Sequence, residues 1–272
     1  MIESEIERKN NFPSKERLEF FSEVTEELFN SYSQDGKIIP EIICDAANIG
    51  YSTGEYGDKF DGMLQFDGKA FHIFINSSVS NSLIRQRFTF CHELGHFIID
   101  EHRNALAKGI SLGHFSQTGF QSDILVEREA DFFAAGLLMP RRRFTKEYQS
   151  FRGFSFENIK RLANSYQSSV LSVIFRLFQL DLHNFMIVKI EASQPTKIKA
   201  IFKSRDFYFY PKYKYDKIPE DSQLFAAIKT GKFCDRTQEI WTGDWFEVTN
   251  ESKMYEHTLN YQNYYYSILW KK

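Results

Sequence analysis

Two histidines and a glutamate fall within five residues, in the string His92-Glu93-Leu-Gly-His96. On a helix, positions i and i+4 share one face, so the imidazoles of His92 and His96 can both reach one metal ion. Glu93 then lies beside the first ligand, where its carboxylate can take a proton from a water molecule. The spacing therefore predicts a helix that carries a metal site suited to hydrolysis.

Apolar residues flank the string on both sides, namely Phe88, Phe90, Phe97, Ile98 and Ile99. Such flanks indicate a helix packed in a core, whereas a chance match on an exposed helix would have polar neighbours. Burial of two imidazoles and a carboxylate is costly unless something compensates them, and a metal ion does so. We therefore interpret the string as part of a ligand set.

A catalytic metal site needs a third protein ligand, and the segment 125–139 offers two glutamates for that role. The apolar face of this predicted helix is formed by Ala130, Phe133, Ala134, Leu137 and Leu138. At about 100° per residue, Glu127 falls roughly 50° from the middle of that face and Glu129 roughly 110° away. Glu127 is the favoured ligand. Glu129 remains the alternative, and is otherwise expected to be solvated or paired with an arginine. Asp131, four residues after Glu127, is expected to accept a hydrogen bond from a ligand histidine.

The elements that position these residues follow from apolar periodicity and turn signals. Helices are predicted over 14–32, 40–47, 82–102 and 125–139, with two shorter helices within 155–180. Alternating residues around Asp67-Gly68 predict a β-hairpin of strands 63–66 and 70–75. The stretch 103–126 is rich in Gly and Ser, and such long connections tend to be functional.

Near residues 180–184 the sequence changes from helical periodicity to short β-type runs, which indicates a domain boundary. Residues 1–14 are polar and expected to be disordered, 15–150 to form the metal-binding domain, and 151–183 to form a helix-turn-helix-like helical segment. Residues 184–272 are expected to form a smaller, mostly-β C-terminal domain, a sensor or a substrate-binding module. Its strands are predicted at 185–190, 198–203, 207–210, 245–248 and 264–270. The fold class is α+β.

Composition excludes several classes of protein. Lys and Arg number 34 against 36 Asp and Glu, so no overall positive field exists to hold nucleic acid or an anionic membrane. No apolar run approaches the roughly 20 residues of a membrane-spanning helix, and no secretory signal is visible. Three cysteines, far apart in the chain, fit reduced thiols in the cytoplasm better than a disulfide framework.

Beyond these arguments, the chain resembles the ImmA/IrrE family of metallopeptidases. The resemblance rests on Arg85-Gln-Arg-Phe-Thr-Phe-Cys-His-Glu-Leu-Gly-His, on Glu127-x-x-Ala-Asp, and on Leu-Leu-Met-Pro140. It implies a zincin-like domain that holds one Zn²⁺ per chain on His92, His96 and Glu127, with Glu93 as general base. One departure is Cys91, where the family usually has alanine. A buried small thiol is the favoured interpretation, and redox inhibition through zinc is the alternative.

The resemblance further implies a zinc-dependent endopeptidase that cleaves a specific regulatory protein, such as an XRE-type helix-turn-helix repressor, in a stress or mobile-element response. We expect an extended substrate to pair with the edge of strand 70–75. His114, in the long connection, is a candidate stabiliser of the transition state. The alternative is a non-catalytic metal-containing regulatory or protein-binding module.

The segment 156–180 has the rhythm of a helix-turn-helix, yet direct DNA binding is not expected. Its second helix offers only Arg176 and Gln179 among apolar residues, whereas a recognition helix presents several polar side chains to base edges and phosphates. Structural packing is the favoured interpretation. The other histidines, His72, His102, His183 and His257, are isolated along the sequence.

Overall fold

The computed structural model describes residues 13–57, 60–78, 82–109, 125–212, 217–233, 236–261 and 263–271. These residues form ten helices and three sheets, which confirms the α+β class. The chain divides into two compact units. The first comprises Met1–Arg152 and Glu157–Arg176, and the second comprises Gly153–Phe156 and Leu177–Lys272.

In the first unit, the first element among the described residues is α2 (Lys15–Tyr32), whose N-cap is Ser14. The Ser14 hydroxyl accepts a hydrogen bond from the backbone N–H of Arg17 at 3.2 Å. A short hairpin of β1 (Ser33–Gln34) and β2 (Lys37–Ile38) leads to α3 (Pro40–Ala47), which has proline in its first turn. Both predicted helices therefore lie where the sequence indicated.

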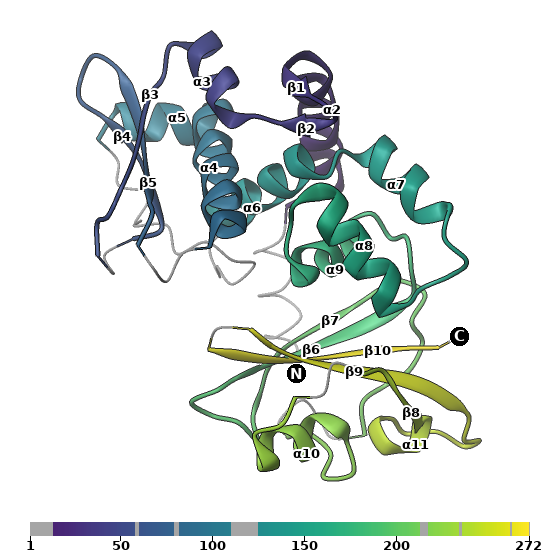
Figure 1. The fold of residues 1–272 in the computed structure, drawn as a ribbon. Helices are drawn as coiled ribbons and strands as arrows, with labels where there is room; N and C mark the ends of the chain where they lie inside the picture. The colour runs from purple at the N-terminus through teal and green to yellow at the C-terminus, as the bar shows by residue number, and fades with distance from the viewer. Residues whose placement is uncertain are drawn as a thin grey trace. The chain divides into compact units, whose positions relative to one another are not determined.

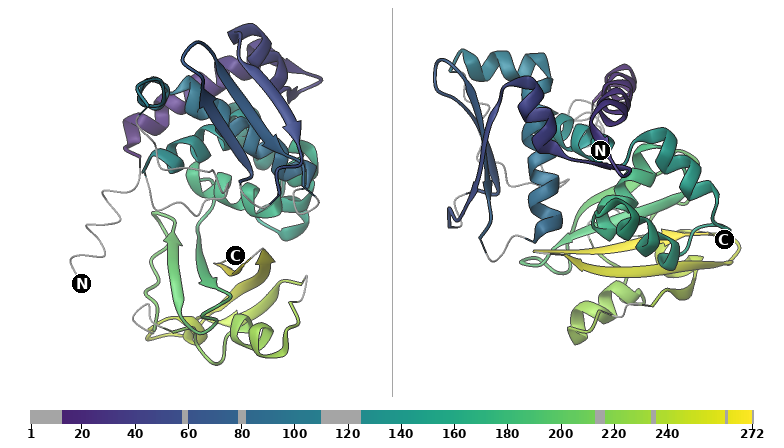
Figure 2. Two further views of the ribbon diagram at one scale, coloured as in Figure 1. Left: turned by 90° about the vertical axis from the view of Figure 1, so that its left-hand side faces the viewer. Right: turned by 45° about the horizontal axis from the view of Figure 1, so that its top comes forward.

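A three-stranded sheet follows, formed by β3 (Gly50–Gly54), β4 (Gly62–Phe66) and β5 (Phe71–Asn76). Its order is β3-β5-β4, so β5 is hydrogen-bonded on both sides, parallel to β3 and antiparallel to β4. The left view in Figure 2 shows the three strands side by side. The expectation that a substrate pairs with the edge of strand 70–75 is therefore wrong, because the parallel partner β3 occupies the second edge of β5.

The predicted helix over 82–102 is divided into α4 (Leu83–Ile98) and α5 (Asp100–Ala107). The residue between them, Ile99, is extended, with φ −72° and ψ 108°, and its side chain is buried. Acidic residues Asp100 and Glu101 occupy the first turn of α5, where the helix dipole favours them. The helix α5 also takes up the beginning of the expected long connection, of which residues 110–124 lie outside the described ranges.

In this unit the sheet, α4, α6 (Leu125–Leu138) and α2 follow one another in layers (Figure 1). Residues 88–96 of α4 are all buried, because the sheet covers one side of the helix and α6 the other. After Pro140, the exposed residues Arg141, Arg142 and Arg143 begin another helix, α7 (Arg141–Gln149).

The helix-turn-helix-like segment consists of α8 (Phe156–Tyr166) and α9 (Val170–Gln179). Arg176, the basic residue of the second helix, is only 3 % exposed and donates from Nε to the carbonyl of Met139 at 3.0 Å. Its guanidinium therefore satisfies a carbonyl just beyond the end of α6, a packing role that leaves it unavailable to a phosphate.

The second unit is built on an antiparallel sheet of β6 (Phe185–Glu191), β7 (Ile198–Lys203), β8 (Gln238–Trp241), β9 (Lys253–Tyr261) and β10 (Tyr264–Trp270), with α10 (Gln223–Thr230) and the short α11 (Thr242–Trp245). The strand order is β7-β6-β10-β9-β8 (Figure 1). Strands predicted at 207–210 and 245–248 are absent. Phe207 and Phe246 instead pack into the core beside Trp245, and the two segments meet in an isolated antiparallel bridge between Pro211 and Phe246 that does not extend into a strand.

A single carboxylate organises the interior of this unit. Glu256 on β9 is completely buried and accepts four hydrogen bonds. Two come from the backbone N–H groups of Gln223 and Leu224 at 3.1 Å, one from Trp245 Nε1 at 3.1 Å and one from the Ser267 hydroxyl at 2.7 Å. Burial raises the pKa of Glu256, and these hydrogen bonds offset part of that rise. The carboxylate thus joins the start of α10 to three other elements.

Removal of this carboxylate should destabilise the second unit. The substitution Glu256→Ala leaves four buried donors without their acceptor, and we expect it to lower the free energy of unfolding by at least about 3 kcal/mol. Urea unfolding followed by tryptophan fluorescence would measure the change. The matched control is Glu239→Ala, which removes an exposed partner of Lys253 and should cost less than about 1 kcal/mol. Equal stabilities of the two variants would contradict the structural role of Glu256.

Candidate metal centre

The two histidines of the string lie on one face of α4, one turn apart. The distance between His92 Nε2 and His96 Nε2 is 3.1 Å, and the two side chains are 1 % and 5 % exposed. Both Nε2 atoms therefore face the same point inside the core. That arrangement suits a shared cation.

Glu127 on α6 faces the same point. Its Oε2 lies 3.2 Å from His92 Nε2, and its Oε1 lies 3.4 Å from His96 Nε2. One ligand atom from each of the three residues lies within 4.8 Å of the others, so the group could hold a metal ion. Glycine at position 95 permits this approach, since a Cβ there would lie 3.2 Å from the Phe133 ring and 3.4 Å from the Ala130 Cα.

The far side of the His92 ring is held by Asp131. Its Oδ1 lies 2.9 Å from His92 Nδ1, and the carboxylate is 2 % exposed. With Nδ1–H donating to Asp131, Nε2 is the nitrogen of His92 that remains for a metal ion, and it faces the group just described. Glu127 and Asp131 are four residues apart on α6, and they thus contact the two nitrogens of one imidazole.

The charges of the site depend on one another. Burial alone would lower the pKa of His92, but the carboxylates of Asp131 and Glu127 raise it well above its ordinary value. Burial lowers the pKa of His96. Although burial opposes it, hydrogen bonding to the two histidines holds the pKa of Glu127 far below its usual range. Without a metal ion, the site therefore retains a proton on His92.

Glu93 is buried at the same level of α4, beside the strand β4. The residue is 1 % exposed, and a Cβ built on Gly62 of β4 would lie only 3.0 Å from Glu93 Oε1 and 2.3 Å from the Thr89 methyl carbon. A side chain at position 62 would thus overlap the Thr89 methyl group and crowd the Glu93 carboxylate. Glycine lets the strand pass directly over Glu93.

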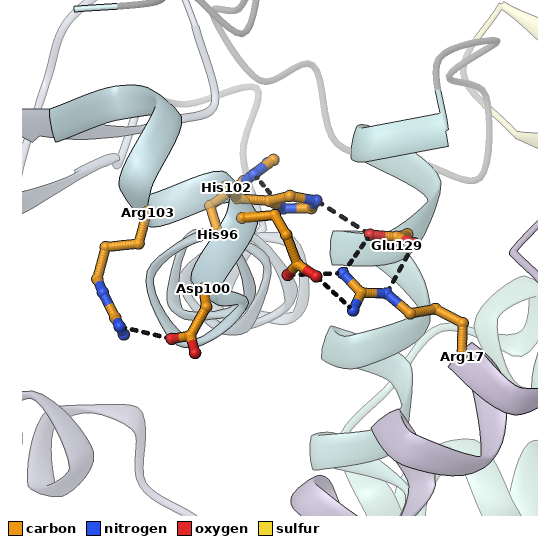
Figure 3. Close-up of polar contacts among 7 residues, drawn as sticks. Arg17, His96, Asp100, His102, Arg103 and Glu129 are labelled. Atoms are coloured by element: carbon orange, nitrogen blue, oxygen red, sulfur yellow. Dashed lines mark hydrogen bonds and ion pairs between the residues drawn. The ribbon is translucent and has the colours of Figure 1, made fainter. Parts of the chain in front are cut away.

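Glu129, the alternative ligand, points away from this group. Its carboxylate is paired with Arg17 of α2 at 3.0 Å and lies 3.1 Å from His102 Nε2 (Figure 3). Hydrogen bonds from His102 and Arg17 lower the pKa of Glu129 despite the opposing effect of burial. Arginine pairing was one of the two outcomes expected for a non-ligand Glu129.

His102 is the residue that sequence reasoning missed. It is 3 % exposed, and its Nδ1 lies 3.2 Å from His96 Nδ1. The separation of six residues from His96 fits no common face of a continuous helix, and only the break at Ile99 brings the two rings together. The acidic pair Asp100-Glu101, which is typical of the first turn of a helix, was the sequence signal that could have indicated this break.

Two further candidates have different outcomes. His114 lies outside the described residues. Cys91 is completely buried in α4, and burial raises the pKa of its thiol to about 12. A protonated, inaccessible thiol is a packing group, as the favoured interpretation of this position expected.

Comparison with known proteins agrees with the class that this fold and site define, an α+β peptidase domain with a His-His-Glu group. The sequence profile of the IrrE N-terminal-like domain, a peptidase family, matches residues 55–178. Residues 55–178 thus belong to the ImmA/IrrE metallopeptidase family, which confirms the resemblance seen in the motifs.

Among solved structures, the chain is similar in fold to a Mycobacterium tuberculosis transcriptional regulator. The TM-score is 0.60 at 12 % identity, over 97 % of this chain and 78 % of that one. No curated protein matches the chain. Within the described ranges, no helix has both the length and the apolar character needed to cross a membrane.

The charges of the site predict a proton-coupled metal affinity. Because the pKa of His92 is raised well above its ordinary value, a metal ion must displace its Nε2 proton at neutral pH. We expect release of about one proton per zinc, and an affinity that rises about tenfold per pH unit between about pH 6 and about pH 8. Calorimetry in buffers of different ionisation enthalpy would count the proton. An affinity independent of pH over this range would contradict the assignment.

Proposed function

We propose that this protein is a zinc-dependent endopeptidase that cleaves a specific regulatory protein. The observation that carries the proposal is the buried group of His92, His96 and Glu127, with Glu93 adjacent, inside a segment that belongs to a peptidase family. Two imidazoles and one carboxylate are a common ligand set of catalytic zinc sites, and they leave a position for water.

The donor chemistry fits zinc better than the hard cations. Imidazole nitrogen is a preferred ligand of zinc, while magnesium and calcium take oxygen ligands. When bound, zinc supplies a lowered pKa for water and polarises the scissile carbonyl. His92, His96 and Glu127 would hold the ion, and one ion per chain is expected.

The protein's own residues then supply orientation and proton transfer. Glu93 accepts a proton from the attacking water and later delivers it to the leaving amine. This role requires a carboxylate that does not itself bind the metal ion. Asp131 holds the His92 ring through Nδ1. Glu93, Asp131 and His92 are all buried, and a low-dielectric interior strengthens each of these interactions.

An extended substrate is best accommodated along β4. This strand lies at an end of the sheet order and crosses Glu93 at Gly62, so a polypeptide added to its edge would run past the general base. An XRE-type helix-turn-helix repressor is the proposed substrate, in a stress or mobile-element response and with a cytoplasmic location. One structural neighbour is described as a transcriptional regulator, which is compatible with such a role.

The second candidate is a non-catalytic, metal-containing regulatory or protein-binding module. This candidate is favoured by the likeness in fold to a protein described as a transcriptional regulator. Glu93 argues against it, because a site that only binds a metal ion does not need a general base. Direct DNA binding through α9 is not part of either proposal.

Glu93→Gln separates the two candidates. We expect this variant to retain stoichiometric zinc and to lose at least about a hundredfold in cleavage rate, because the amide cannot accept the proton. Comparing newly formed protein N-termini in cells that express the wild type or the variant would identify the substrate. Wild-type cleavage that persists in Glu93→Gln, or a biological effect that does not change, would contradict the peptidase proposal.

The third ligand has its own test. Glu127→Ala should abolish stoichiometric zinc binding, whereas Glu129→Ala should still bind about one zinc at micromolar protein, since Glu129 supplies no ligand atom. Elemental analysis of protein purified without chelator measures this. Zinc retained by Glu127→Ala and lost from Glu129→Ala would reverse the assignment.

A further inference from the structure

A chain of hydrogen bonds, buried at His96 and His102 and part-buried at Arg17, extends from the back of His96 to the helix α2. It contains His102 of α5, Glu129 of α6 and Arg17 of α2 (Figure 3). His96 Nδ1 lies 3.2 Å from His102 Nδ1, and His102 Nε2 lies 3.1 Å from Glu129 Oε2. Three helices thus converge behind one proposed metal ligand.

Arg17 donates two hydrogen bonds to the carboxylate of Glu129. Its Nε donates to Glu129 Oε1 and its Nη2 to Glu129 Oε2, both at 3.0 Å. The same guanidinium binds the exposed Glu101 through Nη1 and Nη2, at 3.1 and 3.0 Å. A bidentate arginine holds a carboxylate in one plane, so the orientation of Glu129 is fixed.

With His102 neutral, the donors and acceptors allow one consistent direction for the protons. Arg17 can only donate, so ionised Glu129 only accepts, and His102 must present Nε2–H to it. A neutral His102 then has its lone pair on Nδ1 and accepts from His96 Nδ1–H. This leaves the lone pair of His96 on Nε2, the nitrogen that lies 3.4 Å from Glu127 and 3.1 Å from His92 Nε2.

We propose that the chain Arg17–Glu129–His102 is a positioning device that fixes the tautomer and ring orientation of His96 as a metal ligand. The inference rests on the metal site proposed above. It gives His96 the support that Asp131 gives His92, but through a neutral ring backed by an ion pair instead of a carboxylate in direct contact. It also assigns a role to α2, which precedes the segment 55–178 that matches the peptidase family.

The test measures zinc affinity by competition with a chelator, and the visible absorption of the cobalt-substituted protein. His102→Leu removes the acceptor for His96 Nδ1–H, and Glu129→Gln weakens the hold on His102. We expect each to weaken zinc binding by about ten- to a hundredfold and to change the cobalt spectrum. His102→Gln keeps an acceptor and a donor, and should bind zinc more tightly than His102→Leu.

The matched control is Glu101→Gln, which removes the other carboxylate partner of Arg17 without touching His102. Its zinc affinity should remain within about twofold of the wild type. Thermal unfolding of the metal-free proteins separates positioning from stability. His102→Leu and His102→Gln should differ in zinc affinity and cobalt spectrum even where their unfolding temperatures agree.

Two results would overturn the inference. The first is that the wild type binds zinc and that His102→Leu and Glu129→Gln bind it with the same affinity as the wild type. The other is a loss of affinity in all variants, Glu101→Gln included, that follows only the stability of the metal-free protein. A wild type that binds no zinc would instead overturn the proposed metal site itself, and this inference with it.

Discussion

The close contact between α4 and α6 is the constraint on which the site depends. Gly95 lets the Phe133 side chain and the backbone at Ala130 approach the helix that bears both histidines, and this approach carries Glu127 to within 3.4 Å of each Nε2. A larger side chain at position 95 would press against Phe133 and the α6 backbone. Glycine at this position therefore contributes to the close packing that holds the site together.

The same contact explains why α6 carries three acidic residues in five positions without a solvated face. Glu127 and Asp131, one turn apart, contact the two nitrogens of His92, while Glu129 faces α5 and α2. Each carboxylate has a cationic or hydrogen-bonding partner suited to its surroundings. Buried charge is tolerated in such a helix only where every member is satisfied.

Much of this could be read from the sequence, and the limits have physical causes. The face of α6 that contains Glu127 followed from apolar periodicity, because a helix wheel is a local property. The same helical wheel placed Glu129 farther from the core. Glu129 is nonetheless only 8 % exposed, because α2 covers the side of α6 that periodicity assigned to solvent. The placement of β5 between two strands was missed, because the pairing with β3 joins segments distant in sequence.

Other differences reflect short-range ambiguity. Phe207 and Phe246 had the apolar character of strand residues, but irregular backbone packs them into the core of the second unit equally well. The break at Ile99 carries neither glycine nor proline, so only the acidic pair after it marks a new helix. The position of the His102 ring behind His96 depends on that break, and no pattern of residues in the sequence could have predicted it.

The pairing of Arg17 with Glu129 has a consequence for where the working domain begins. The segment that matches the peptidase family starts at residue 55, yet the cation that balances a buried carboxylate beside the site, Arg17, lies on α2. A fragment cut to the recognisable segment would keep every proposed ligand and lose that cation, leaving Glu129 charged and uncompensated next to His102. The boundary drawn by sequence similarity and the boundary drawn by electrostatic balance are therefore different, and the second includes α2.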